Sequence, residues 1–133
     1  MTSKVVYLGD LRTECTHEQS GDSFITDAPT DNNGKGLAFS PTDTVATGLA
    51  SCMITVMGIK ARDLAVDMTG TSAEVTKTMA SNPRRISKIE VLMTLPFQAD
   101  QKTKTILENT GRTCPVLNSL HPDIEKEISF IWA

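Results

Sequence analysis

The chain has 133 residues, of which 39% are hydrophobic and 5% aromatic, and its formal net charge is −3. This length suits one domain, and so few aromatic residues favour a chain that shares its core with a second copy. The acidic balance, without a cluster of lysine and arginine, argues against nucleic acid as a partner. No segment approaches the roughly 20 apolar residues of a membrane span, and no signal peptide is recognisable, so we expect a cytoplasmic protein without a membrane partner.

The cysteines and histidines of the chain form no metal-binding pattern. Three cysteines in a chain that is expected to be cytoplasmic do not make a disulfide framework, and no Cys-X-X-Cys motif is present. His17 and His121 lie far apart without companion ligands, so we expect neither a metal nor another cofactor. Cys15 has no helical context, and we interpret it as a strand residue without a chemical role.

The N-terminal third of the chain is predicted to consist of short strands. Alternating or β-branched residues favour strands over residues 4–8, 11–17 and 23–26. Turns are expected at Gly9-Asp10 and at Ser20-Gly21-Asp22. Residues 31–36, which are rich in asparagine and glycine, are predicted to form a loop.

A long helix is predicted from Pro41 onwards. Ser40 is placed as its N-cap, Pro41 at the first helical position and Asp43 at the acidic position of a capping box. An apolar stripe at steps of three and four residues is expected to face the core. This stripe consists of Val45, Leu49, Cys52, Val56 and Ile59.

The remaining segments alternate between strand and helix patterns. Residues 68–79 and 85–95 predict a hairpin, residues 100–112 and 114–120 predict two helices, and residues 125–132 predict a further strand. The order of elements indicates an α+β fold in which antiparallel sheets pack on a long central helix. We expect residues 1–133 to form a single domain.

Two cysteine motifs together resemble the OsmC/Ohr family, the osmotically inducible and organic hydroperoxide resistance proteins. The first motif is Ser40-Pro41-Thr42-Asp43 leading to Ala50-Ser51-Cys52-Met53, and the second is Cys114-Pro115-Val116-Leu117-Asn118-Ser119-Leu120. The order of strands and helices also agrees, so the resemblance covers nearly the whole chain. It implies an OsmC-like fold, an intertwined homodimer with two active sites at the subunit interface, and thiol-dependent reduction of organic hydroperoxides.

Cys52 is the candidate peroxidatic nucleophile, and Cys114 is the candidate resolving thiol. Only a thiolate attacks a peroxide, and an ordinary thiol with a pKa of about 8.5 is mostly protonated at neutral pH. Cys52 lies several turns into its helix, where the helix dipole has little effect, so the chemistry requires a cationic partner. Cys114 is expected at an N-cap, where backbone N–H groups favour a thiolate and a good leaving group. The alternatives are a small buried hydrophobe at Cys52 and a simple helix cap at Cys114.

The resemblance implies that an arginine near the first strands pairs with the reactive thiolate, and Arg12 matches by region. The Gly-Gly-Arg pattern of the hydroperoxide resistance branch is absent, and Arg84 and Arg85 are the alternatives. Asp43 either orients the arginine, as an acid near this helix start does in relatives, or only caps the helix. The glutamate of the hydroperoxide resistance branch would stand at the position of Thr42.

These residues lead us to expect a thiol peroxidase. The Cys52 thiolate would attack a hydroperoxide and become a sulfenic acid, Cys114 would condense with it to a disulfide, and an external dithiol would restore both thiols. The apolar neighbours Leu49, Met53 and Met57 would favour organic hydroperoxides over hydrogen peroxide. The alternative class is a non-peroxidatic redox sensor or small-molecule-binding dimer that keeps the fold and both thiols.

Overall fold

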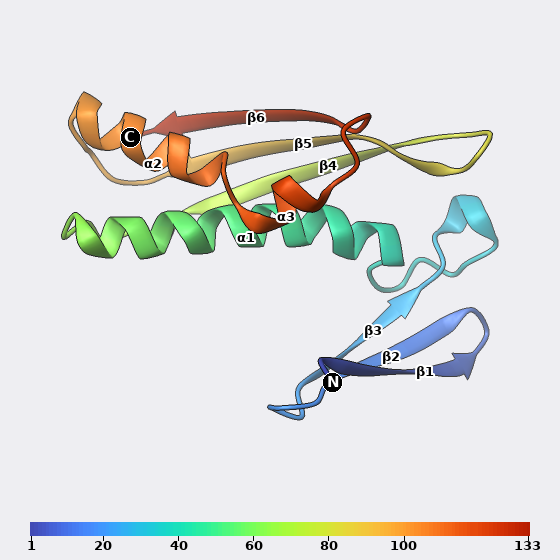
Figure 1. Cartoon of the computed structure of the whole chain (residues 1–133). Coiled ribbons are helices and arrows are strands. Elements are labelled where there is room, and N and C mark those ends of the chain that lie inside the picture. Colours follow the sequence, from blue (N-terminus) through green and yellow to red (C-terminus); the bar gives the residue numbers. More distant parts are fainter. The chain divides into compact units, whose positions relative to one another are not determined.

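The computed structural model describes residues 1–133, which divide into two compact units. Residues 1–45 form the N-terminal unit, and residues 46–133 form the C-terminal unit. The order of strands and helices (Figure 1) is the predicted one, with an additional 3₁₀ turn, η1, at Thr30–Asn32. The α+β class is therefore confirmed, whereas the single domain stays a prediction.

The N-terminal unit contains a three-stranded antiparallel sheet in the order β1-β2-β3. Its strands are β1 (Ser3–Gly9), β2 (Arg12–His17) and β3 (Ser23–Asp27). The β1–β2 turn is made by Asp10 and Leu11, whose φ angles of 53° and 62° give the turn that a two-residue hairpin loop needs. The backbone N–H of Leu11 donates to the hydroxyl of Tyr7 at 3.2 Å, which holds a leucine in a conformation that leucine rarely adopts.

This sheet exposes apolar side chains on both of its faces. Val5, Tyr7 and Phe24 share one face and are 60%, 64% and 51% exposed, while Val6 and Leu8 lie on the other face. No hydrophobic residue of the N-terminal unit is fully buried, so the unit lacks an apolar core of its own. The side chains that it does bury are polar or charged and belong to Thr26, Asp27 and Ser40.

The C-terminal unit contains the second sheet, in the order β4-β5-β6. Its strands are β4 (Ser72–Ala80), β5 (Arg85–Leu95) and β6 (Glu125–Trp132). The β4–β5 hairpin is antiparallel as predicted, but β6 pairs with β5 in parallel, so the expectation of purely antiparallel sheets is wrong for this pair. The physical reason is the connection: residues 96–124 return the chain to the starting end of β5, as a parallel pair requires.

Three helices accompany this sheet, and they are α1 (Pro41–Asp63), α2 (Gln101–Gly111) and α3 (Pro115–Ser119). Figure 1 shows α1 running along the sheet, with α2 and α3 in the connection between β5 and β6. The Asp100 side chain caps α2 by accepting the N–H of Thr103 at 2.8 Å. The end of α2 packs tightly on α1, because a Cβ added to Gly111 would lie 2.8 Å from the Sδ of Met57.

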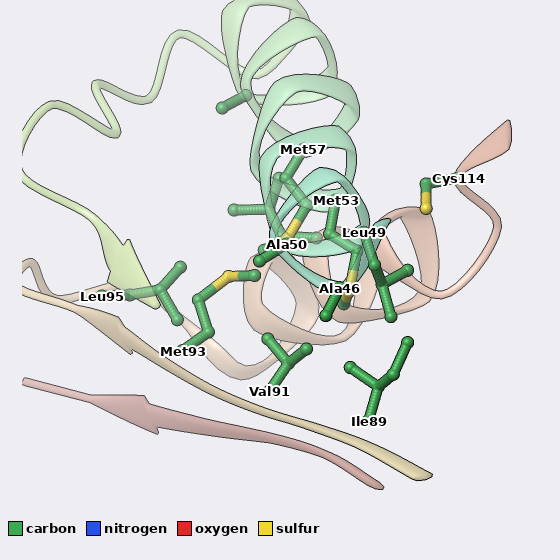
Figure 2. Packing of buried hydrophobic residues seen from close by; sticks show 12 residues of the cluster. Ala46, Leu49, Ala50, Met53, Met57, Ile89, Val91, Met93, Leu95 and Cys114 are labelled. Atoms are coloured by element: carbon green, nitrogen blue, oxygen red, sulfur yellow. The ribbon is translucent and has the colours of Figure 1, made fainter. Parts of the chain in front are cut away.

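The core of the C-terminal unit lies between α1 and β5 (Figure 2). Val45 and Ile59 of the predicted stripe are 41% and 60% exposed, so the expectation that they face the core is wrong. The helix turns its methionines and alanines inward instead, because alanines allow a close approach and the long methionine side chains fill the remaining gaps. The buried residues are Ala46, Leu49, Ala50, Met53, Met57 and Ala61 of α1 with Ile89, Val91, Met93 and Leu95 of β5, Leu107 of α2 and Cys114.

The length and mean hydropathy of α1 would allow it to cross a membrane, which corrects the expectation that no segment is apolar enough. One such helix is weak evidence, since the core helix of a soluble protein passes the same test. Here α1 contributes half of the core cluster, which accounts for its apolar composition without a membrane.

Candidate functional site

The start of α1 is fixed by a reciprocal capping box. The backbone N–H of Asp43 donates to the Ser40 Oγ at 3.1 Å, and the N–H of Ser40 donates to the Asp43 Oδ2 at 3.0 Å. Ser40 is 1% exposed, so the cap is protected from water. Asp43 therefore forms the predicted capping box, and its orienting of an arginine stays a prediction.

Cys52 lies in the middle of α1, beside the buried stripe. It carries a free thiol that is half-buried and packs at the border of the apolar cluster. The neighbouring residues Gly48 and Ser51 have small side chains, so little of the helix surface projects around the thiol. Cys52 thus has the partial accessibility that a nucleophile needs.

Cys114 is the N-cap of α3, as the sequence predicts. Its Sγ accepts the backbone N–H of Leu117 at 3.3 Å, and Pro115 occupies the first turn of the helix. The residue is completely buried and its side chain joins the apolar cluster, at whose edge Figure 2 shows its sulfur. Cys114 therefore has a defined orientation and no access to solvent within its own chain.

The structure brings the thiols of Cys52 and Cys114 within reach of each other. Burial is the main cause that raises the pKa of Cys114, and the neighbouring Cys52 thiol raises it further. The N–H groups of Leu117 and Val116 act in the opposite direction without prevailing. The expectation that the N-cap position makes Cys114 a ready thiolate is therefore wrong, because loss of hydration outweighs two backbone donors.

This arrangement gives the two sulfurs different chemical properties. Two adjacent thiolates would repel each other, so ionisation of both thiols at once is unfavourable. Because burial raises the pKa of Cys114, this thiol favours its protonated form. Both cysteines are free, and the pair can exist as two thiols or, after oxidation, as a disulfide.

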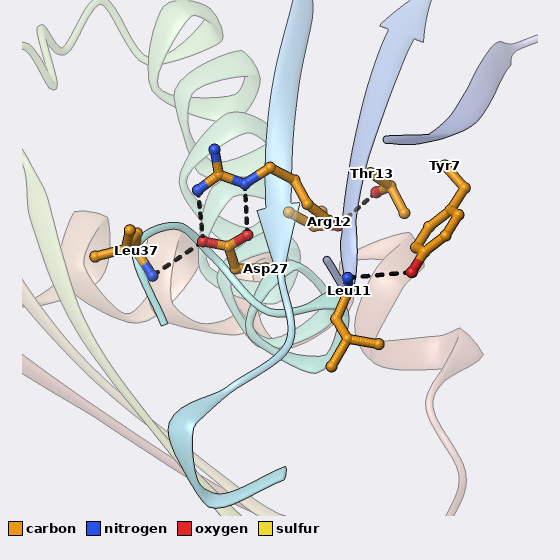
Figure 3. Close-up of polar contacts among 7 residues, drawn as sticks. Tyr7, Leu11, Arg12, Thr13, Asp27 and Leu37 are labelled. Carbon is orange, nitrogen blue, oxygen red and sulfur yellow. Dashed lines mark hydrogen bonds and ion pairs between the residues drawn. The ribbon is translucent and has the colours of Figure 1, made fainter. Parts of the chain in front are cut away.

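Arg12 lies in the N-terminal unit and is held by a carboxylate that the sequence analysis missed. Its Nε lies 2.7 Å from the Asp27 Oδ1 and its Nη2 lies 2.9 Å from the Asp27 Oδ2, as Figure 3 shows. The backbone N–H of Leu37 also donates to the Asp27 Oδ2, at 3.1 Å. The hydrogen bond from Arg12 is the main cause that lowers the pKa of Asp27, so this carboxylate remains ionised.

A signal for Asp27 was present in the sequence. The turn between β2 and β3 sets a register in which Arg12 stands directly opposite Asp27. Directly opposed residues of an antiparallel pair share one face of the sheet, where opposite charges attract. Extending the third predicted strand by one residue and counting across the hairpin would have found the pair.

The alternative arginines, Arg84 and Arg85, have different neighbours from those of Arg12. The Nη1 of Arg85 donates to the carbonyls of Ser81 and Pro83 at 2.9 and 2.8 Å, so it closes its own turn, and Arg84 is exposed beside it. Cys15 lies in β2 opposite Phe24, consistent with a strand residue. No group of three or more histidine, cysteine, aspartate or glutamate side chains is placed to hold a metal ion.

Comparison with known protein families gives one match to this chain. The model of the family described as OsmC-like protein matches residues 34–129. This range contains both cysteine motifs and the capping box of α1. A comparison with curated protein sequences finds no match.

The solved structures that are similar to this chain differ widely in their sequence identity to it. A candidate osmotic stress induced and detoxification response protein from Psychrobacter arcticus 273-4 is 56% identical, with 98% of this chain and 96% of that chain covered and a TM-score of 0.95. An organic hydroperoxide resistance protein from Elizabethkingia anophelis is 13% identical, with 100% and 97% covered and a TM-score of 0.76. The organic hydroperoxide resistance protein OsmC from Legionella pneumophila is 16% identical, with 98% and 96% covered and a TM-score of 0.71. At these last two identities the likeness shows the fold alone.

Proposed function

Because the chain belongs to the OsmC-like protein family, we propose that it is a thiol-dependent peroxidase that reduces organic hydroperoxides through Cys52 and Cys114. The observation that carries this proposal is the pair of free, adjacent thiols with unequal burial. A peroxidatic cycle needs one accessible thiolate and one neighbouring thiol that waits in the protonated form. The half-buried Cys52 and the fully buried Cys114 support this division of roles.

The proposed cycle has three steps. The Cys52 thiolate attacks one oxygen of the hydroperoxide, the O–O bond breaks, and the other oxygen leaves with a proton as the alcohol. The sulfur of Cys114 then attacks the resulting sulfenic acid, releasing water and forming the Cys52–Cys114 disulfide. An external dithiol reduces this disulfide by thiol–disulfide exchange and is itself oxidised to a disulfide. Arg12 is the proposed cation that stabilises the Cys52 thiolate.

The alkyl group of the substrate requires apolar contacts near Cys52. Leu49, Met53 and Met57, which the sequence analysis assigned to this task, are 0% exposed and pack in the core, so that assignment is wrong. Val56 and Ile59 follow Cys52 by four and seven residues and thus share its side of α1. Val56 is half-buried and Ile59 is 60% exposed, which makes them the better candidates to contact an organic substrate.

We also propose that the chain works as a homodimer in the cytoplasm. The exposed Val5, Tyr7 and Phe24 on one face of the N-terminal sheet support an interface with a second copy, since single chains rarely leave such patches uncovered. A disulfide that must be reduced in every cycle suits the reducing cytoplasm. A mass of twice 14.4 kDa in light scattering would support the dimer.

The proposed reaction is tested with cumene hydroperoxide and a dithiol as reductant. We expect Cys52→Ser to lose turnover, and Cys114→Ser to stop after one oxidation with a sulfenic acid on Cys52 that dimedone traps. Cys15→Ser is the matched control, because Cys15 is the remaining thiol and stands in the sheet of the N-terminal unit. Full turnover in Cys52→Ser would overturn the proposal.

The second candidate function is a redox sensor that oxidises slowly. It is favoured by one observation, the close pairing of Arg12 with Asp27, because a neutralised cation stabilises a thiolate less than a free one does. Thiol counting after one equivalent of hydroperoxide separates the two functions. Rapid loss of two thiols per chain indicates the peroxidase, whereas slow loss indicates the sensor.

A further inference from the structure

We propose that Arg112 is a positioning residue that holds Cys114 beside Cys52 by fixing the end of α2 on β6. The inference rests on the proposed function, because it concerns the step in which Cys114 closes a disulfide with Cys52. All of the residues that it involves lie in the C-terminal unit. Three sets of contacts support it.

The first set joins Arg112 to β6. The guanidinium carbon of Arg112 lies over the ring of Phe130, 5.3 Å from its centroid, and Nη2 donates to the carbonyl of Ile128 at 3.3 Å. A planar guanidinium can stack on a ring and donate a hydrogen bond from its edge at the same time, which a lysine ammonium cannot do. Arg112 therefore fixes the end of α2 on this strand at two points.

The second set ties Cys114 to the same end of α2. The backbone N–H of Thr113 donates to the carbonyl of Thr110 at 3.1 Å, and the Thr113 hydroxyl donates to the same carbonyl at 2.8 Å. The backbone N–H of Cys114 donates to the carbonyl of Gly111 at 3.4 Å. Both residues that follow Arg112 are thus bonded back to the last turn of the helix. The sulfur of Cys114 therefore moves with the end of α2.

The third set joins the end of α2 to the helix that carries Cys52. A Cβ added to Gly111 would lie 2.8 Å from the Sδ of Met57 and 3.6 Å from the Cε of Met53, so the two helices touch here. Met53 directly follows Cys52 in α1, and Figure 2 shows both methionines projecting from this helix. Gly111 and Arg112 thus bind the end of α2 to two different elements. Loss of the Arg112 contact would leave the packing on α1 alone.

A disulfide makes a narrow demand on the position of Cys114. The two Cα atoms must lie within about 7 Å of each other, with a torsion of about 90° around the S–S bond. A small displacement of the end of α2 therefore weakens the Cys52–Cys114 disulfide even when the fold is intact. The attack of Cys52 on the hydroperoxide does not involve Cys114, so that step should not change. Arg112 is exposed, so its replacement leaves the core cluster in place.

The test measures the stability of the disulfide against glutathione in a Cys15→Ser background. Two glutathione thiols reduce the protein disulfide to two thiols and form glutathione disulfide, and the oxidised fraction is read by alkylation and mass. We expect Arg112→Met to lower the equilibrium constant for the protein disulfide by about 3- to 10-fold, the size of one exposed cation–π contact or hydrogen bond. This corresponds to a reduction potential that is higher by about 15–30 mV. The rate at which dimedone-reactive Cys52 forms with cumene hydroperoxide should stay the same.

The matched control is Lys104→Met, the same replacement in another contact between α2 and β6. The Nζ of Lys104 lies over the ring of Trp132, 5.6 Å from its centroid, but ten residues before Cys114. Its loss should cost similar stability and leave the reduction potential unchanged. Phe130→Leu removes the ring under Arg112 and should act as Arg112→Met does, so it takes that variant's place should Arg112→Met fold poorly.

A change in potential in Arg112→Met that Lys104→Met does not share would support the positioning role. A change in Arg112→Met no larger than that in Lys104→Met, including no change in either, would overturn the inference and leave the peroxidase proposal standing. A parent protein that forms no Cys52–Cys114 disulfide with the hydroperoxide would overturn the proposed cycle and the inference with it.

Discussion

The two units of the chain are stabilised by different means. The C-terminal unit encloses a cluster of completely buried apolar residues, among them Leu49, Met53 and Met93. The N-terminal unit buries Asp27 and Thr26 and leaves most of its large apolar side chains exposed. The C-terminal unit therefore has an apolar core of its own, whereas the N-terminal unit relies on hydrogen bonds and an ion pair.

This contrast also divides the proposed chemistry. Cys52 and Cys114 belong to the unit with the core, where burial raises the pKa of Cys114. The proposed cation and its carboxylate belong to the unit without one, where an ion pair provides the fixed geometry. Apolar packing therefore fixes the side chain of Cys114 in one unit, and an ion pair fixes that of Arg12 in the other.

The largest difference in stability between changes in the two units is expected when a core residue of the C-terminal unit is truncated. Leu49→Ala removes a completely buried side chain from α1 and should lower the free energy of unfolding by about 2–5 kcal/mol. Val5→Ala, at a position 60% exposed, should change it by less than about 0.5 kcal/mol in a single chain. Urea unfolding measures both. Equal losses of stability in the two variants would show that Val5 is buried as well as Leu49, and would contradict the contrast between the two units.

A second variant tests whether a second copy of the chain packs on the N-terminal sheet. If a second copy does, Phe24→Ser should raise the dissociation constant of the dimer by about 10- to 100-fold, because buried aromatic side chains carry much of an interface's binding energy. Val6→Ser changes the opposite face of the same sheet. Sedimentation over a range of concentrations identifies the covered face, and a dimer that neither variant weakens would place the interface elsewhere.

A third prediction concerns the tight contact between α1 and α2. Gly111→Ala introduces a Cβ at 2.8 Å from the Met57 Sδ, in a region where Met57 is completely buried, and should cost about 1–3 kcal/mol of stability. Gly58→Ala is the matched control in α1, since its Cβ would meet nothing within 4 Å. It should stabilise the helix by up to about 1 kcal/mol. Opposite shifts of the thermal midpoint are expected, and a stabilised Gly111→Ala would contradict the packing described.

The smallest expected effect is the pH dependence of the stability that the Arg12–Asp27 ion pair contributes. Because Arg12 lowers the pKa of Asp27 below its ordinary value of 3.8, the folded state favours the ionised carboxylate. Its contribution to stability is complete above about pH 4 and is lost as the pH falls through the lower folded-state pKa. Asp27→Asn should therefore be less stable than the parent at pH 6, with a smaller difference at pH 3. A difference that does not shrink in acid would assign the stability to packing instead.

Local features were predictable from the sequence, and features that depend on tertiary contacts were not. The caps at Ser40 and Cys114 follow from a few neighbouring residues, and the structure has both. The parallel pairing of β6 depends on where a long connection returns, which no local pattern specifies. The raised pKa of Cys114 depends on burial by distant segments, so the cap alone predicted the wrong direction. The contact of Arg12 with Asp27 needed the register of a hairpin rather than a motif.

The parallel pairing of β5 and β6 has a consequence for the time at which the thiols meet. Cys114 lies inside the connection over residues 96–124, so it is held in place from both sides only after β6 has joined β5. Pairings between distant segments form slowly, because the loop between them must close before its contacts stabilise it. During synthesis Cys52 emerges from the ribosome long before Cys114. The thiols of Cys52 and Cys114 are therefore expected to come together late in folding, when β6 completes the C-terminal unit.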